Sequence, residues 1–187
     1  MVRTTALILA ALAWLALARP AGAQTTPVAG GAPARPTPRL TARRTDGRIA
    51  VDGRLDETDW ARVQPAKDFL QKDPDEGKPA TEATEVRLLY DDDALYVGAR
   101  MFDSEPSKIA KRLTRRDGDT DGIADRFIVG IDAHHDKLTG SLFWVTAAGS
   151  IGDGVLYNDT GDDETWNGVW DAAVSVDDKG WVAEMRI

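Results

Sequence analysis

The chain has 187 residues and a formal charge of −8, and 42% of its residues are hydrophobic, which is close to the norm for globular proteins. It contains no cysteine, which excludes disulfides, zinc–thiolate sites, iron–sulfur clusters and a catalytic thiol. From Asp46 onward there are 17 basic and 31 acidic residues, a formal charge of −14, and this acidity argues against nucleic-acid binding.

The first 23 residues have the three parts of a secretory signal peptide. Arg3 gives a short basic start, residues 6–18 form an apolar run, and the Ala-Gly-Ala at 21–23 places small side chains before a cleavage site at Gln24. The alternatives are a buried helix or a membrane anchor, but the run is too short to span a bilayer. We therefore expect export to the periplasm or cell envelope, in association with the outer membrane. Residues 24–45, with four prolines and two adjacent glycines, are expected to form a flexible linker.

From Asp46 onward, apolar residues recur at every second position, which predicts strands. A short strand is expected at 47–53, and a helical turn at 55–63 is expected to begin at an Asp56 cap and to pack Trp60 inward. A hairpin and then five further strands are predicted at 82–90, 95–102, 125–132, 138–146, 151–158, 169–176 and 181–187. Residues 46–187 are therefore predicted to form an antiparallel, jelly-roll-like β-sandwich with one short helix.

The C-terminal strand predicts an exposed sheet edge. Trp181, Ala183, Met185 and Ile187 alternate with other residues up to the last position of the chain. A strand of this kind at the end of a domain leaves its backbone groups unpaired. We therefore expect a piece of a longer protein whose sandwich lacks its last strands.

The segments IAVDGRLDETDW, TEVRLLYDDDALYVGARMFD, DRFIVGIDAHHD and GWVAEMRI resemble family 9 carbohydrate-binding modules, within the wider DOMON-like group. The closest resemblance is to modules at the N-terminus of secreted bacterial proteins, where an outer-membrane-type β-barrel domain of unknown function follows. The resemblance implies a β-sandwich with structural calcium that holds a sugar between aromatic rings. In sugar-binding members one clamping Trp precedes the strand equivalent to DRFIVGID, and here residues 121–124 contain no aromatic side chain. The second clamping Trp would lie beyond Ile187.

Candidate sugar-binding residues flank the acidic loop that follows Tyr157. Tyr157, Trp166 and Trp170 could stack on the apolar faces of a sugar, and Asn167 could bond its hydroxyl groups. The alternative is core packing. It is favoured for Trp170 because this residue alternates with the apolar residues of the predicted strand at 169–176. Trp144 is interpreted as a packing residue.

Four aspartates have the spacing of a calcium-binding loop. Asp117, Asp119 and Asp121 occupy alternate positions before a glycine, and Asp125 stands at the ninth position of the same loop. Ile128 replaces the usual glutamate at the twelfth position, so the loop is not an intact EF-hand. We predict weak structural calcium binding by these four residues, and the alternative is a solvated acidic loop.

Catalysis by this domain is not expected. The carboxylates of Asp92–Asp93 and of residues 162–164 fall in predicted turns, where solvent keeps them ionised, whereas a glycosidase needs one with a raised pKa. Whether the full-length protein is an enzyme stays an open question, since modules of this family are often attached to glycoside hydrolases. Some DOMON relatives bind heme through Met and His, for which Met101, His134 and His135 are candidates, and the alternative for the histidines is a hydrophilic turn.

These observations predict an exported, non-catalytic module that binds a polysaccharide or oligosaccharide and serves a larger protein engaged in polysaccharide use or catabolism. Its partner within the chain would be a covalently continuous downstream domain, a membrane β-barrel. The alternative is a structural or docking domain of that barrel with no retained sugar site. A third hypothesis is a heme-binding DOMON-like domain, which a Soret absorbance measurement would detect.

Overall fold

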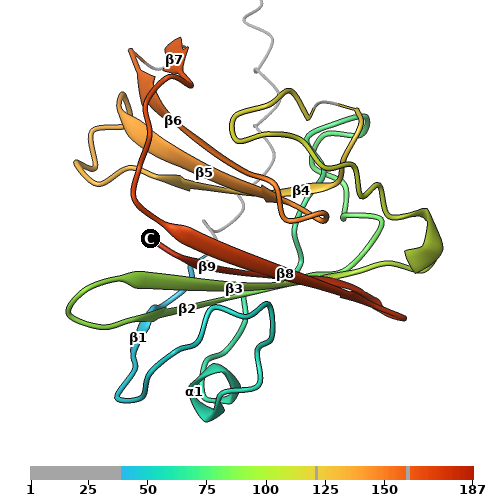
Figure 1. Ribbon diagram of the computed structural model, residues 1–187, viewed down its shortest axis with the longest axis horizontal. Coiled ribbons are helices and arrows are strands. Elements are labelled where there is room, and N and C mark those ends of the chain that lie inside the picture. Colours follow the sequence, from blue (N-terminus) through green and yellow to red (C-terminus); the bar gives the residue numbers. More distant parts are fainter. Residues whose placement is uncertain (1–38, 121, 159–160) are drawn as a thin grey trace, which may run out of the picture. The chain divides into compact units, whose positions relative to one another are not determined.

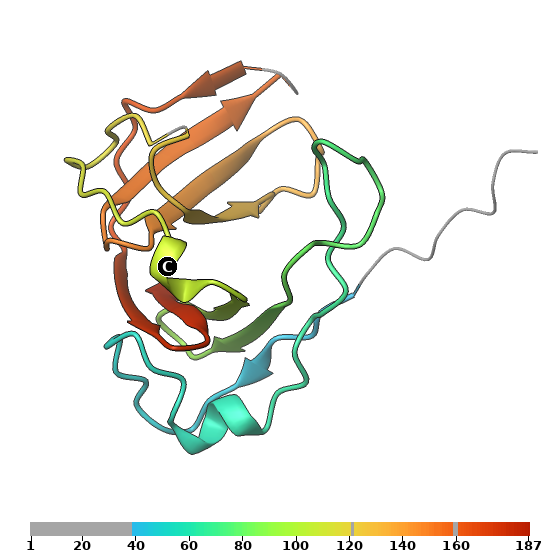
Figure 2. The same ribbon diagram turned by 90° about the vertical axis from the view of Figure 1, so that its right-hand side faces the viewer.

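The structure, a computed structural model, describes residues 39–120, 122–158 and 161–187. The predicted signal peptide and residues 24–38 of the predicted linker lie outside the described residues. The described chain folds as a β-sandwich of two sheets, which face each other in Figures 1 and 2. None of the helices in this described part is long and apolar enough to cross a membrane.

One sheet has five strands and the other has four. The five-stranded sheet has the order β1 (Arg43–Arg44), β2 (Thr84–Tyr90), β3 (Leu95–Phe102), β9 (Gly180–Arg186) and β8 (Asp171–Asp177). The four-stranded sheet has the order β4 (Arg126–Ile131), β5 (Gly140–Thr146), β6 (Ile151–Tyr157) and β7 (Gly161–Asp163). β1 is parallel to β2, and the other strand pairs are antiparallel. The helices are short: α1 spans Thr58–Ala61 and the 3₁₀ helix η1 spans Pro106–Lys108.

The main core lies between the two sheets. Val97 and Ala99 of β3 and Met185 of β9 pack with Phe143 and Val145 of β5, and all five side chains are buried. Their spacing of two follows from the strand, which directs successive side chains to opposite faces. The alternating pattern therefore predicted the inward face of β3 and β9 correctly.

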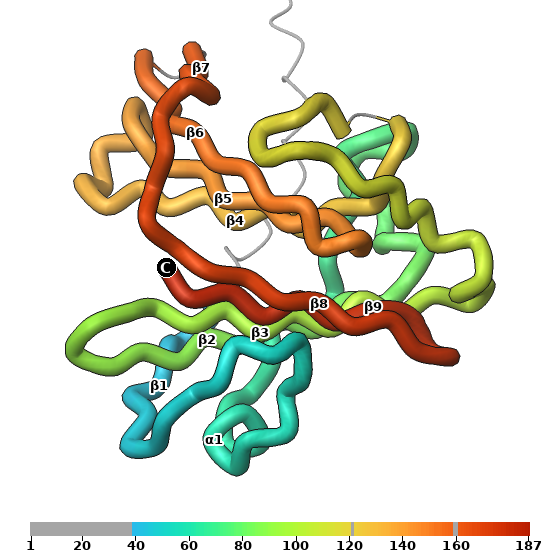
Figure 3. The backbone as a smooth tube through the Cα atoms, in the orientation of Figure 1, coloured from blue at the N-terminus to red at the C-terminus, as the bar shows by residue number. Residues whose placement is uncertain are grey.

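A second core covers the other face of the five-stranded sheet. Trp60 of α1 is 1% exposed and packs with Ile49, Leu89 and Tyr96. Figure 3 shows α1 on the side of this sheet that faces away from β4–β7. We call residues 45–63 the cap segment. Because of the cap segment, both faces of the five-stranded sheet are covered. The predicted inward packing of Trp60 is confirmed.

The structure corrects the predictions at the start of the domain. Residues 47–53 form no strand, and they cross the sheet as irregular backbone whose amides bond to side chains. The domain also begins before the predicted boundary at residue 45: β1 pairs with β2, and Thr45 is buried with its Oγ1 donating to Asp59. The expected Asp56 cap is wrong as well, since Glu57 holds the N-cap position of α1 and makes no side-chain capping bond.

The structure also corrects the predicted sheet edge. β9 is an interior strand that pairs with β3 on one side and with β8 on the other. Its apolar alternation therefore reflects burial within the sandwich. The outer strands of the five-stranded sheet are β1 and β8, and β7, which was predicted as a turn, is an outer strand of the other sheet.

Candidate functional site

The loop between β7 and β8 presents an aromatic ring to solvent. Trp166 is 37% exposed, and its indole meets the ring of Phe143 edge-on, with centroids 6.0 Å apart and an interplanar angle of 72°. Inside the loop, Asp163 Oδ1 accepts hydrogen bonds from the backbone N–H and the hydroxyl of Thr165, at 2.8 and 2.6 Å. These bonds lower the pKa of Asp163, the hydroxyl bond contributing most, so the carboxylate stays ionised. Asn167 Nδ2 donates to the carbonyl of Thr165 at 3.0 Å, which further restrains the loop.

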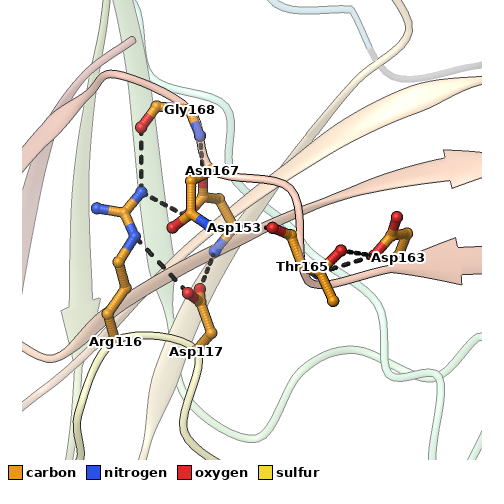
Figure 4. Close-up of polar contacts among 7 residues, drawn as sticks. All are labelled: Arg116, Asp117, Asp153, Asp163, Thr165, Asn167 and Gly168. Carbon is orange, nitrogen blue, oxygen red and sulfur yellow. Dashed lines mark hydrogen bonds and ion pairs between the residues drawn. The ribbon is translucent and has the colours of Figure 1, made fainter.

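A buried carboxylate lies beneath this loop (Figure 4). Asp153 of β6 is 0% exposed, and its Oδ1 accepts a 2.5 Å hydrogen bond from Arg116 Nη2 while its Oδ2 accepts one from the backbone N–H of Gly168. The same Arg116 nitrogen donates to the carbonyl of Gly168 at 3.1 Å. On the other side, the backbone N–H of Asp153 donates to Asp117 Oδ1 at 3.0 Å. Burial of a charge is tolerated here because Arg116 and the backbone amide of Gly168 compensate it.

A polar cavity of about 330 Å³ adjoins the loop. Its wall contains carboxylates, an arginine, a threonine hydroxyl and one indole, from Asp117, Gly118, Asp119, Thr120, Arg126, Trp144 and Glu164. Arg126 Nη1 donates to Thr120 Oγ1 at 3.1 Å. The indole of Trp144 lies against Gly152 on the neighbouring strand, where a Cβ would come within 2.2 Å of the ring. This combination of an aromatic ring with hydroxyl-bonding groups is suited to a small polar ligand.

The structure brings together two of the four predicted sugar-binding residues. Trp166 and Asn167 lie on the same restrained loop, as described above. Trp170 is 5% exposed and packs on Phe143, with centroids 5.5 Å apart, so it belongs to the core and offers no free ring face. Tyr157 is 46% exposed at the far end of β6, about 13 Å from Asp153 along the strand. The prediction for Trp170 is therefore corrected, and the prediction for Tyr157 stays a prediction.

Sequence reasoning missed the polar cavity that Trp144 and Glu164 line. Trp144 was interpreted as packing, and it is 7% exposed, but its ring also forms part of the cavity wall. Arg116 and Asp153 could not be predicted as site residues, because neither belongs to a sequence motif. The available signal was Gly152, since a glycine opposite a tryptophan in a strand pair leaves room for the ring to lie on the sheet.

Two of the aspartates predicted to bind calcium accept hydrogen bonds from backbone amides. Asp117 Oδ1 accepts the backbone N–H of Asp153, and Asp125 Oδ2 accepts the backbone N–H of Ala110 at 3.0 Å. Asp121 lies outside the described residues. Within the described part of the chain, no group of three or more His, Asp or Glu side chains is placed to hold a metal ion. The described members of the predicted set therefore do not by themselves form a calcium site.

One of the turn carboxylates is held in an ion pair, and the heme-ligand candidates lie in different sheets. Asp92 forms a 2.7 Å ion pair with Arg44, and hydrogen bonding to this arginine lowers the pKa of Asp92. Met101 lies on β3 in the five-stranded sheet, whereas His134 and His135 occupy the turn that joins β4 to β5 in the other sheet.

Comparison with known proteins supports the fold. A search of solved structures matches a family 9 carbohydrate-binding module from Caldicellulosiruptor kristjanssonii in complex with cellotriose. The TM-score is 0.54 at 17% sequence identity, and the match covers 80% of this chain and 67% of that one. No protein-family model matches the chain, and no curated protein matches it. At this identity the likeness establishes a shared β-sandwich fold and leaves the ligand to be argued from the site.

Proposed function

We propose that this domain is a non-catalytic glycan-binding module whose site combines Trp166 with the adjoining polar cavity. The observation that carries the proposal is the exposed Trp166 ring on a loop whose polar groups are already fixed by hydrogen bonds. The structural neighbour in complex with cellotriose supports the same class of ligand. A single stacked ring contributes on the order of 1 kcal/mol beyond area burial. We therefore expect weak affinity, roughly millimolar or about −4 kcal/mol.

The test is an NMR titration of the domain with cellotriose, followed by a panel of soluble oligosaccharides. We expect small, saturable shifts at Trp166, and Trp166→Ala is expected to abolish them with little change in melting temperature. Tyr90→Ala is the matched control, because Tyr90 is 40% exposed at the end of β2 in the other sheet. Saturable shifts that persist in Trp166→Ala would place the ligand elsewhere, and no shifts with any oligosaccharide would contradict glycan binding.

A structural or docking role is the second candidate function. It is favoured by the absence of an aromatic residue at 121–124, where sugar-binding modules of the resembled family have a clamping Trp. In this alternative the sandwich is retained as a rigid domain of an outer-membrane β-barrel protein. In both alternatives the protein is exported, with cleavage before Gln24, and the module belongs to the periplasm or cell envelope.

Calcium binding by the 117–125 loop remains a further proposal. The spacing of Asp117, Asp119, Asp121 and Asp125 supports it, and Asp117 and Asp125 would have to keep their present hydrogen bonds or exchange them for the ion. Calorimetry of the domain with calcium chloride tests the proposal, with Asp119→Ala as the variant. No calcium heat in the unsubstituted protein would rule it out.

A further inference from the structure

We infer that Asp153 is a positioning residue that holds the two walls of the proposed glycan site together before a ligand arrives. This inference rests on the proposed function above. In this inference Asp153 need not touch the sugar. Its role is to hold the loop that carries Trp166 in a fixed position relative to the cavity.

The two walls come from segments far apart in the chain. One wall is the segment 116–120, which supplies Asp117 to the cavity, and the other is the segment 164–168, which supplies Glu164 and carries Trp166. Asp153 bonds to both walls: its N–H donates to Asp117, and its carboxylate accepts from Arg116 and from Gly168. Figure 4 shows Arg116 and Gly168 meeting at this single carboxylate.

Fold stability alone does not account for a charge at this position. Asp153 pairs with Phe143 on the inward face of the four-stranded sheet, where Ile151 of the same strand packs into the core. An apolar side chain at 153 would continue that core, and replacing a buried ion pair with apolar residues often leaves a protein equally or more stable. What an apolar side chain cannot do is bond Gly168 and Arg116. The distinctive contribution of Asp153 is therefore the fixed geometry of the loop.

A fixed loop favours binding because ordering it in the complex would otherwise oppose association. Immobilising flexible side chains at a binding surface costs conformational entropy and so weakens binding. For a ligand bound at roughly millimolar affinity, a site with two disordered walls would lose most of that affinity. The bond network of Asp153 removes part of this cost in advance.

The experiment compares Asp153→Asn with the unsubstituted protein by amide hydrogen exchange and by cellotriose titration. Asparagine has one side-chain oxygen, so its NH₂ group must face either Arg116 or the Gly168 amide. The hydrogen bond to that partner is then lost. We expect exchange of the Gly168 amide to rise at least tenfold, unchanged protection in β9, and at least fivefold weaker cellotriose binding. Asp178→Asn, an exposed aspartate in the β8–β9 turn, is the matched control and should behave as the unsubstituted protein.

Arg116→Lys provides a second variant in case Asp153→Asn unfolds, because lysine keeps a positive charge near Asp153 but lacks the guanidinium group that bonds Asp153 and the Gly168 carbonyl. It should loosen the same loop and weaken the same titration. Unchanged exchange at Gly168, or a loosened loop with unchanged affinity, would overturn the inference. If the unsubstituted protein does not bind cellotriose or any other oligosaccharide, the proposed function fails, and with it the role of Asp153 in binding, whereas the exchange data still report whether Asp153 orders the loop.

Discussion

A second buried carboxylate, Glu184, fastens the cap segment to the sheet. Glu184 of β9 is 0% exposed, and its Oε2 accepts the backbone N–H groups of Asp52 and Gly53 at 2.9 and 3.1 Å. Its Oε1 accepts the indole N–H of Trp60 at 3.3 Å. These donors are neutral, so no cation offsets the loss of solvation. Burial raises the pKa of Glu184 to about 7, and the nearby Glu57 carboxylate adds to the rise.

This pKa predicts a domain that loses stability as the pH rises. The folded-state value of about 7 lies above the ordinary value of 4.5, so the folded protein binds this proton more tightly than the unfolded chain does. The stabilising contribution is therefore complete below about pH 4.5 and is lost as the pH rises through 7. Urea unfolding at pH 5 and pH 8 should differ by on the order of 3 kcal/mol from this group. Glu184→Gln should flatten the profile while Glu105→Gln, an exposed glutamate, keeps it, and an unchanged slope in Glu184→Gln would contradict the prediction.

At the scale of elements, the cap segment meets β8 through one glycine. Gly53 has a φ of +82°, and a Cβ there would lie 2.7 Å from the carbonyl carbon of Val174. The carbonyl of Gly53 also accepts a 2.7 Å hydrogen bond from the hydroxyl of Ser175. The atoms that a Cβ would meet are backbone atoms of Val174, so no flexible side chain could move aside. The close approach of cap and sheet therefore depends on this position having no side chain.

Gly53→Ala is expected to destabilise the domain through both strain and collision. Gly122→Ala is the matched control, because Gly122 has a φ of +67° but no atom within 4 Å of its Cβ position. Both variants should show the strain of a left-handed alanine, and Gly53→Ala should lose a further 1–3 kcal/mol, approximately the effect of overpacking. Equal unfolding free energies for the two variants would show that the cap tolerates displacement.

The sequence predicted elements wherever local alternation determines them. The β2–β3 hairpin was predicted because polar and apolar residues alternate across Asp91–Asp93, and the inward face of β9 followed from the same pattern. β7 was missed because Asp162 and Asp163 have the composition of a turn, although their backbone pairs with β6. The position of β9 inside the sheet could not be predicted, because alternation indicates which face is buried and carries no information about lateral neighbours.

The candidate site was predicted in part for a similar reason. Trp166 and Asn167 were recognised because both belong to one polar loop. The network of Asp153 joins residues that are distant in sequence, and a single buried aspartate in a strand gives no local signal. The polar cavity likewise exists only once β4, β5, the 117–120 segment and Glu164 are assembled.

At the scale of the whole molecule, the export prediction can be tested on the protein's own N-terminus. Residues 1–23 should be absent from exported protein, which should begin at Gln24, because the small residues Ala21 and Ala23 suit a signal peptidase. N-terminal sequencing of the extracytoplasmic fraction measures this directly. Ala23→Leu should retain the uncleaved form, since a bulky residue at the cleavage site blocks processing. Exported protein that still begins at Met1 would contradict the signal-peptide interpretation.

The interior position of β9 also has a kinetic consequence. Within the described residues, β3 and β8 are joined through β9, and β9 follows the other strands in chain order. The five-stranded sheet therefore cannot close until residues 180–186 have left the ribosome, and its β3–β9 pairing brings together positions separated by most of the domain. Such a high contact order makes folding slow, because the entropy of closing long loops must be overcome before native pairing stabilises them.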